Sequence, residues 1–320
     1  SLSGNGNDGL DLDDTATNSS VSVKNSSLTD NGEDGIELEG TDNTLKVEKS
    51  DVSGNADDGL DVNGSANDVS INKSSFSDNL EDGVAIEGSD NTLTINKSAF
   101  SNNGSEAIAD RGSGNTVIVT DSTGASILLP IENAGFEAPT LADGDYTFGS
   151  VPGWEIYDPN DLVPNNPTND TSNISVFNPD AGYYPGEAPE GNNVGDVYLI
   201  QDPFSGFAGL SQTIDTLLAP NTQYTLEVEV GNAAGSFEGF DLTGFPGYRV
   251  ELLAGGQVLS ADDNTLSIAE GTFGTSTVTY NSAANDPLLG EPLGIRLINP
   301  LQGPGLEVSF DNVQLRATQI

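Results

Sequence analysis

The stretch that decides the fold is "SDNLEDGVAIEGSDNTLTINKS", residues 77–98. It contains two pairs of large apolar residues with period-2 spacing, Val84/Ile86 and Leu93/Ile95, set between Asn, Asp and Gly. Period-2 alternation indicates β-strands, and turn residues on both sides keep these strands short. The stretch also carries five acidic side chains and one lysine, which is much charge around little apolar surface.

Nearly the same text recurs throughout the first 122 residues. Equivalent positions repeat at spacings of 26, 24, 24 and 24 residues, in an apolar column (Leu2, Leu28, Val52, Phe76, Phe100), an asparagine column (Asn5, Asn31, Asn55, Asn79, Asn103) and a glycine column (Gly9, Gly35, Gly59, Gly83). One set of three short strands cannot bury its apolar face alone, but stacked coils share a continuous core. The repeat therefore predicts a right-handed parallel β-helix of about five coils over residues 1–127.

The repeated units "DG-[LIV]-x-[LIV]" and "N-x-[LV]-x-[VI]" resemble the pectate-lyase-like β-helix repeat. In such a stack, side chains of one column lie about 4.8 Å apart. We expect the asparagine columns to form amide ladders along the turns.

An acidic column in the same repeat contains Asp34, Asp58 and Asp82, and we expect it to face outward. Carboxylates at this spacing repel one another unless water, a proton or a cation separates their charges. One interpretation is ordinary turn chemistry, because Asp before Gly is a common turn pair. The other is calcium bound between coils, which makes these three residues candidate metal ligands.

The repeat ends before residue 128, and a different pattern follows. Alternating segments such as "QYTLEVEVG" and "YRVELLAGGQVL" are separated by loops rich in Pro, Gly and Asn, without a helical stretch. This pattern predicts an all-β fold for the second domain as well, an antiparallel β-sandwich of the jelly-roll type over residues 128–320.

The ends of the second domain carry more specific motifs. An opening "N-x-GFE" and "PGW" (Asn133 to Glu137, and residues 152–154) pairs with a closing "FDNVQL" at residues 310–315. This bracketing resembles the galactose-binding-like jelly rolls of several carbohydrate-binding module families. The resemblance covers residues 131–318 and implies a structural calcium with Glu137 and Asp311 as ligands.

A sugar site would need exposed aromatic rings beside amide and carboxylate groups. The loop "NPDAGYYPGEAPEGNN" is the best candidate, because the adjacent Tyr183 and Tyr184 are not both expected to be buried. Tyr157 and Trp154 are further candidates for carbohydrate binding. For any one of these rings core packing is the competing interpretation, and it is the favoured one for Trp154.

The overall charge restricts the partners. The 320 residues hold 50 acids and nine bases, a net charge of −41, which disfavours nucleic acid and anionic lipid and favours cations such as calcium. No apolar run is long enough to predict membrane insertion. The composition is typical of secreted or cell-surface bacterial proteins, and residue 1 falls inside a repeat, so we expect further domains upstream.

The chain lacks cysteine, histidine and methionine, which removes thiolate nucleophiles and every triad built on histidine. The β-helix offers Arg111 and five lysines, but its columns are uniform, whereas catalytic sites use individual residues. The sequence therefore favours a non-catalytic segment: a spacer joined to a calcium-stabilised module that binds a glycan or surface polysaccharide. Two alternatives stay open, a polysaccharide-active enzyme (lyase, hydrolase or epimerase) with catalytic coils upstream, and a purely structural cap.

Overall fold

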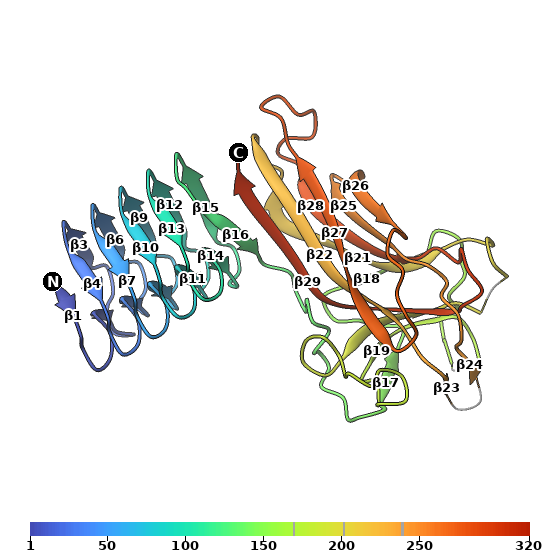
Figure 1. Cartoon of the computed structure of the whole chain (residues 1–320). Helices are drawn as coiled ribbons and strands as arrows, with labels where there is room; N and C mark the ends of the chain where they lie inside the picture. The colour runs from blue at the N-terminus through green and yellow to red at the C-terminus, as the bar shows by residue number, and fades with distance from the viewer. Residues whose placement is uncertain (169, 201, 238–239) are drawn as a thin grey trace. The chain divides into compact units, whose positions relative to one another are not determined.

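The computed structural model describes residues 1–168, 170–200, 202–237 and 240–320. Strands and turns form two compact units, one of residues 1–130 with Arg316–Ile320 and one of Ile131–Leu315. Within the described ranges no helix is long and apolar enough to cross a membrane. Figure 1 shows the strands of each unit, labelled where there is room.

The first unit is a solenoid built from three parallel sheets. The first sheet contains β1 (Leu2–Ser3), β4 (Ser27–Thr29), β7 (Asp51–Ser53), β10 (Ser75–Ser77) and β13 (Ala99–Ser101). The second contains β2 (Leu10–Leu12), β5 (Ile36–Leu38), β8 (Leu60–Val62), β11 (Val84–Ile86), β14 (Ile108–Asp110) and β16 (Ser126–Leu129). The third contains β3 (Ser20–Lys24), β6 (Thr44–Glu48), β9 (Asp68–Asn72), β12 (Thr92–Asn96) and β15 (Thr116–Thr120). The predicted parallel β-helix is confirmed.

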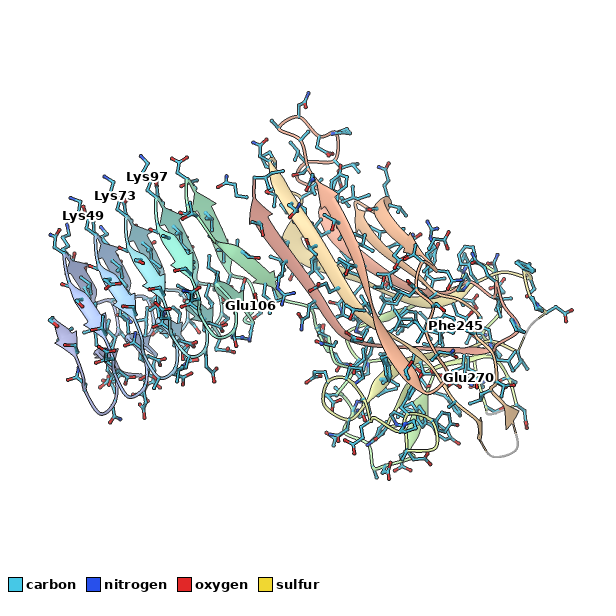
Figure 2. The ribbon with its side chains drawn as sticks, viewed as in Figure 1. Lys49, Lys73, Lys97, Glu106, Phe245 and Glu270 are labelled. Atoms are coloured by element: carbon cyan, nitrogen blue, oxygen red, sulfur yellow. The ribbon has the colours of Figure 1, made fainter. Side chains whose placement is uncertain are left out.

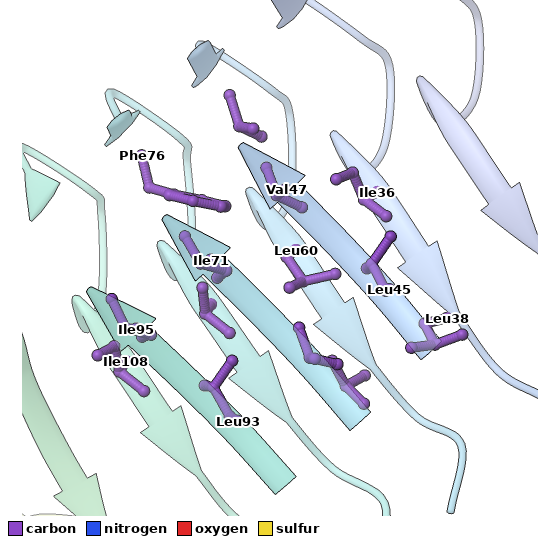
Figure 3. Packing of buried hydrophobic residues seen from close by; sticks show 14 of the residues in the cluster. Ile36, Leu38, Leu45, Val47, Leu60, Ile71, Phe76, Leu93, Ile95 and Ile108 are labelled. Carbon is purple, nitrogen blue, oxygen red and sulfur yellow. The ribbon is translucent and has the colours of Figure 1, made fainter. Parts of the chain in front are cut away.

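The solenoid core is a stack of the apolar columns (Figure 3). The pairs Val84/Ile86 and Leu93/Ile95 are buried against the equivalent residues of the neighbouring coils. Each coil alone would leave this surface in water, so the apolar burial that stabilises the unit is shared between coils.

Asparagine ladders satisfy the buried turns, as expected. The Asn31 Nδ2 atom donates to Asn55 Oδ1 at 2.9 Å, and Asn55 Nδ2 donates to Asn79 Oδ1 at 2.9 Å. In the second column the backbone N–H of Asn43 donates to Asn67 Oδ1 at 2.9 Å. These bonds matter because a buried polar group without a partner destabilises the fold.

A lysine column follows one edge of the solenoid, where Figure 2 shows Lys49, Lys73 and Lys97 pointing outward from successive coils. All three have positive φ angles, 52°, 54° and 52°. Left-handed backbone is unfavourable for residues other than Gly, Asn and Asp, so the turn geometry is imposed by the stacking of the coils.

The second unit contains two antiparallel sheets. One has the strand order β17 (Tyr146–Phe148), β19 (Asn173–Phe177), β20 (Val194–Tyr198) and β29 (Glu307–Gln319), followed by β22 (Thr222–Asn232) and β27 (Thr272–Asn281). The other has the order β18 (Glu155–Tyr157), β21 (Ala208–Leu217), β28 (Pro292–Asn299), β25 (Arg249–Ala254) and β26 (Gln257–Asp263). Strand β23 (Ser236–Phe237) pairs antiparallel with β24 (Phe240–Asp241). This arrangement is compatible with the expected antiparallel β-sandwich.

Strands β19 and β20 are buried on both faces. Alternate residues of a strand point to opposite faces, so Ile174, Val176 and Val197 share the apolar face of the sheet. The opposite face carries Ser175 and Asp196, and these residues are buried as well. A buried face with polar side chains requires another explanation than core packing, and this face forms the candidate site.

Candidate active site

A cavity lies on the polar face of the sheet β17–β19–β20–β29. Its cavity volume is about 60 Å³. Ten residues line it: Tyr146, Phe148, Asn173, Ser175, Phe177, Tyr183, Asp196, Tyr198, Leu242 and Glu307.

The antiparallel register brings most of these residues together. Phe148 lies opposite Ser175, Ser175 lies opposite Asp196, and Tyr198 lies opposite Glu307 on the neighbouring strand. Because residues i and i+2 of a strand share a face, all of them point to the same side of the sheet. Residues far apart in the sequence thus form one wall.

Aromatic rings make up much of the lining. The Phe177 and Tyr183 rings meet edge to face with centroids 4.8 Å apart, and the Tyr146 and Phe148 centroids are also 4.8 Å apart. Such faces offer a flat apolar surface for a ring-shaped ligand, and their quadrupoles attract positive charge.

Glu307 places a carboxyl group in this aromatic wall. Its side chain is only 8% exposed, and its Oε1 atom finds no hydrogen-bond partner among the described residues. Burial raises the pKa of Glu307 well above its ordinary value, and the negative charge of Asp196 raises the pKa further. Both causes favour the protonated form of Glu307.

Asp196 is a second buried acid beside it. The Ser309 hydroxyl donates to Asp196 Oδ1 at 2.9 Å, and the Tyr184 hydroxyl donates to Ser309 Oγ at 3.0 Å. Burial raises the pKa of Asp196, but the bond from Ser309 opposes this rise. No such donor acts on Glu307 Oε1 among the described residues, so the two acids differ in their environment.

A second group of acids holds the loop that leads into β20. Glu137 Oε1 accepts the backbone N–H groups of Asn192 at 2.8 Å and Asn193 at 2.7 Å. Asp311, which is fully buried, accepts the N–H of Glu190 at 2.9 Å. Burial raises the pKa of Asp311 to about 8, and the charges of Glu190 and Glu137 contribute to this rise.

These three carboxylates fit a hard cation. No lysine or arginine in the described ranges forms an ion pair with Glu137, Glu190 or Asp311, and the buried Oδ1 atom of Asn193 has no partner there. Calcium prefers six to eight oxygen ligands of this kind. The charges of Glu137, Glu190 and Asp311 act on one another, but these acids are not among the described groups whose oxygens lie within 4.8 Å of one another.

The acidic column of the solenoid is buried, so the expectation that it faces outward is wrong. Asp34 Oδ1 accepts the backbone N–H of Asp58 at 2.7 Å, and Asp58 Oδ1 accepts that of Asp82 at 2.6 Å. One oxygen of each carboxylate therefore completes the turn of the next coil, because the parallel stacking leaves these N–H groups inside. Burial is the largest cause that raises the pKa of Asp34 to about 7 and that of Asp58 to about 8.

The members of the acidic column differ in the charged side chains that surround them. Arg111 Nη1 donates to Asp82 Oδ2 at 2.7 Å and so neutralises the charge of this carboxylate. Asp34 instead has oxygens close to Glu37 and Asp61, within 4.8 Å of one another. Asp34 and Asp58 thus lie among other acids, and no lysine or arginine in the described ranges forms an ion pair with them. At Asp82 the guanidinium group of Arg111 provides the positive charge.

The expectation that Tyr183 and Tyr184 are exposed is wrong, since they are 5% and 0% exposed. Tyr183 lines the cavity, and Tyr184 binds Ser309 behind it. Both lie inside because the loop folds over the polar face of the sheet, and the Tyr184 ring packs against Phe273 with centroids 4.2 Å apart.

Trp154 and Tyr157 lie outside the cavity. Trp154 is buried, stacks on Phe136 with centroids 5.4 Å apart and donates its Nε1–H to a backbone carbonyl, as the core interpretation expects. Tyr157 belongs to β18 in the other sheet, where the Arg296 guanidinium lies 4.3 Å from its ring centroid. The four aromatic candidates therefore do not form one site.

The sequence reasoning missed Asp196 and Glu307. A signal for both was present, since each acid interrupts an apolar strand pattern, in "VGDVYLI" and "LEVSF". An acid inside a buried strand needs a partner or a function, because burial of an unpaired charge is costly.

The fold and the cavity define the class, a parallel β-solenoid followed by a β-sandwich domain with an acid in an aromatic cavity. A sequence model of right-handed β-helix regions matches residues 1–123, and the HpiC1-like cyclase model, described as HpiC1 cyclase, matches residues 127–316. The chain belongs to the HpiC1 cyclase family.

Two solved structures give the degree of similarity. The Stig cyclase Fisc from Fischerella sp. TAU, in complex with (3Z)-3-(1-methyl-2-pyrrolidinylidene)-3H-indole, is 55% identical over 61% of this chain and 99% of its own, with a TM-score of 0.60. A cyclase from the same organism, in complex with 4-(1H-indol-3-yl)butan-2-one, is 56% identical over 60% of this chain and 98% of its own, with a TM-score of 0.59. No curated protein matches the chain.

These similarities overturn the functional prediction. A non-catalytic spacer joined to a carbohydrate-binding module was expected, whereas residues 127–316 match a cyclase family. The motifs at residues 133–137 and 310–315 bracket a sandwich, but a carbohydrate-binding jelly roll does not follow from them, because strand-end motifs report the fold and not the site that it carries.

Proposed function

We propose that residues 131–315 form a cyclase that acts on an indole-bearing substrate, with Glu307 as the general acid. The observation that carries this proposal is the buried Glu307 carboxyl group, whose Oε1 atom has no hydrogen-bond partner in the described structure and which lines an aromatic cavity. A protonated acid in such a place has the state that proton donation requires.

The proposed reaction needs no redox partner. Glu307 donates its proton to a carbon–carbon double bond of the substrate, and the neighbouring carbon becomes a cation. The π electrons of the indole attack this cation and form the ring bond, after which the ring carbon returns a proton to the Glu307 carboxylate. The atoms of substrate and product are the same, so the step is an isomerisation.

The cavity supports this chemistry in two ways. The rings of Phe177, Tyr183 and Tyr198 offer faces that stabilise a developing cation, and a buried wall keeps water from trapping it. An indole is flat and aromatic, and both Fischerella cyclase structures hold an indole compound.

A comparison of two variants tests the proposal. The full chain is incubated with 3-alkenylindoles, and chromatography with mass spectrometry detects products of unchanged mass. Glu307→Gln keeps the shape of the side chain but cannot protonate carbon, so turnover falls by about 100-fold or more. Glu155→Gln makes the same change on an exposed strand and keeps full turnover. Equal turnover of the wild type and Glu307→Gln would exclude the proposed role.

We also propose that the sandwich binds calcium through Glu137, Glu190 and Asp311. The loop that ends in Asn193 leads directly into β20, which carries Asp196 and Tyr198. A cation there would fix this loop and thereby the wall of the cavity. The chain's residues, and not the cation, perform the proton transfer in this proposal.

A separate calcium site in the solenoid is proposed at Asp34 and Asp58. Glu37, Asp57 and Asp61 surround them, and their oxygens meet Asp34 in two groups whose atoms lie within 4.8 Å. A cation would replace the protons that these buried carboxylates otherwise hold. Asp82 is not included, because Arg111 already contacts it.

A further inference from the structure

Three buried side chains form a hydrogen-bonded chain behind the proposed acid. Tyr184 donates to Ser309 and Ser309 donates to Asp196, at 3.0 and 2.9 Å. Ser309 lies directly opposite Asp196 in the antiparallel pair of β20 and β29, and Glu307 lies two residues before Ser309 on the same face. The chain therefore ends at a carboxylate next to Glu307 in the cavity wall.

The direction of the two bonds separates the roles of the two acids. The Ser309 hydroxyl donates its hydrogen bond to Asp196, and the Tyr184 hydroxyl donates to Ser309. Asp196 is therefore the acceptor and can do this without a proton of its own. A hydrogen bond donated to a carboxylate favours its charged form. Glu307 Oε1 has no such donor among the described residues.

Two buried carboxyl groups this close do not both carry a charge readily, because each charge opposes the other in a low dielectric. The first proton therefore belongs to Glu307, whose Oε1 atom has no donor among the described residues. Pairs of acids in unequal environments divide the roles of proton holder and charged neighbour in this way.

We propose that Tyr184 and Ser309 hold Asp196 as a carboxylate, and that its negative charge keeps Glu307 in the proton-bearing form. This inference rests on the proposed function for its catalytic meaning, since it makes Asp196 the positioning residue that sets the pH range of the cyclisation. Asp196 acts through Glu307 and transfers no proton to the substrate.

The titratable groups that line the cavity beside the pair are phenols, and one further acid, Asp170, acts on Tyr198. The titratable side chains that face it from the remaining elements are Tyr146 on β17, Tyr183 in the loop and Tyr198 on β20. Burial, together with the charges of Glu307, Asp170 and Asp196, raises the pKa of Tyr198, so this phenol stays neutral. No lysine or arginine lines the cavity in the described ranges.

The test follows the proton on Glu307 directly, without a substrate. Difference infrared titration of the full chain records the carbonyl band of protonated carboxyl groups, and the part that disappears in Glu307→Gln belongs to Glu307. Asp196→Asn keeps a similar shape but removes the charge, so the titration midpoint of this band falls by about one pH unit or more. A midpoint that does not move in folded Asp196→Asn overturns the inference.

A second variant keeps the test decisive if Asp196→Asn does not fold. Ser309→Ala removes the donor to Asp196, which then competes for the proton, so the midpoint of the Glu307 band falls as well. The matched control is Ser175→Ala, which removes a hydroxyl opposite Asp196 on the other neighbouring strand and leaves the midpoint unchanged. Equal midpoints in Ser309→Ala and Ser175→Ala would contradict the proposed role of the hydrogen-bonded chain.

Activity separates this inference from the proposed function. If 3-alkenylindoles are converted, the alkaline limb of the rate profile moves to lower pH in Asp196→Asn. Turnover at a fixed pH on that limb then falls about tenfold for every pH unit by which the limb moves. If the Glu307 band moves but no substrate is converted, the proposed cyclase function fails and the arrangement of the two acids stands.

Discussion

At the residue scale, Gly135 shows how closely the acid cluster of the sandwich is packed. A Cβ atom at this position would overlap the Glu190 carboxylate. The glycine in "N-x-GFE" therefore leaves room for Glu190 beside Glu137 and Asp311.

Asp311→Asn is the residue-scale prediction for that site. The wild-type chain is expected to melt at a lower temperature after chelation and to recover with added calcium, because the cation offsets the repulsion among the buried Asp311, the half-buried Glu137 and the exposed Glu190. Asp311→Asn loses one ligand charge, so its melting temperature responds less to calcium. Differential scanning calorimetry measures both, and Asp286→Asn, which changes an acid outside both proposed cation sites, is the control. A calcium response as large as that of the wild type would argue against Asp311 as a ligand.

At the scale of the element, an asparagine ladder depends on each of its members. Asn55 is fully buried, accepts from Asn31 and donates to Asn79. Removal of this side chain leaves polar atoms of both neighbours without a partner inside the protein. A single substitution thus damages three coils.

Asn55→Ala is expected to lower the free energy of unfolding by about 2–4 kcal/mol, because each unsatisfied buried group costs about 1–3 kcal/mol. Denaturant unfolding followed by circular dichroism measures the change. Asn7→Ala removes an amide from an exposed turn of the same solenoid and is expected to change the free energy by less than about 0.5 kcal/mol. Similar effects of the two substitutions would show that the ladder does not contribute as described.

The acidic column predicts how solenoid stability depends on pH. Folding raises the pKa of Asp34 from 3.8 to about 7 and that of Asp58 from 3.8 to about 8, mainly by burial. The folded state therefore binds more protons than the unfolded state between about pH 4 and pH 8. Their contribution to stability is complete below about pH 4 and is lost as the pH rises through about 8.

Thermal melts across this range check the sign without and with calcium. Without calcium the melting temperature falls between about pH 5 and pH 8, and calcium reduces the fall because it takes the place of the protons. Asp58→Asn removes one of the titrating groups, so its pH dependence is weaker. A melting temperature that rises over this range in the chelated wild type would contradict the assignment.

At the scale of the whole molecule, the net charge of −41 opposes the folded state. Repulsion between exposed acids extends over the Debye length, about 30 Å at 0.01 M salt and about 8 Å at 0.15 M. We expect the melting temperature to rise when sodium chloride increases across this range, as measured with chelator present. A fall would mean that specific ion pairs outweigh the general repulsion.

Much of the solenoid could be predicted, because the information is local. Each strand pairs with the equivalent strand about 24 residues later, as in Val84 with Ile108, so one repeat contains all the positions that the next repeat must match. Glu137 and Asp311 were predicted as calcium ligands from motifs, and this stays a prediction, although both accept backbone N–H groups of the segment before β20. The prediction that Asp82 faces outward was wrong. The sequence pattern of a turn does not show whether its carboxylate faces water or accepts a backbone N–H of the neighbouring coil.

The sequence by itself determined the parallel stack, its core columns, its asparagine ladders and the β-sandwich class of the second domain. Only the tertiary structure decided that Tyr146, Asp196 and Glu307 line one cavity, that Tyr184 supports it from behind and that Asp34, Asp58 and Asp82 are buried. The physical reason is the range of the contacts. Stacked coils repeat the same short-range pairing, whereas the cavity depends on antiparallel strands whose order and register join residues far apart in the chain.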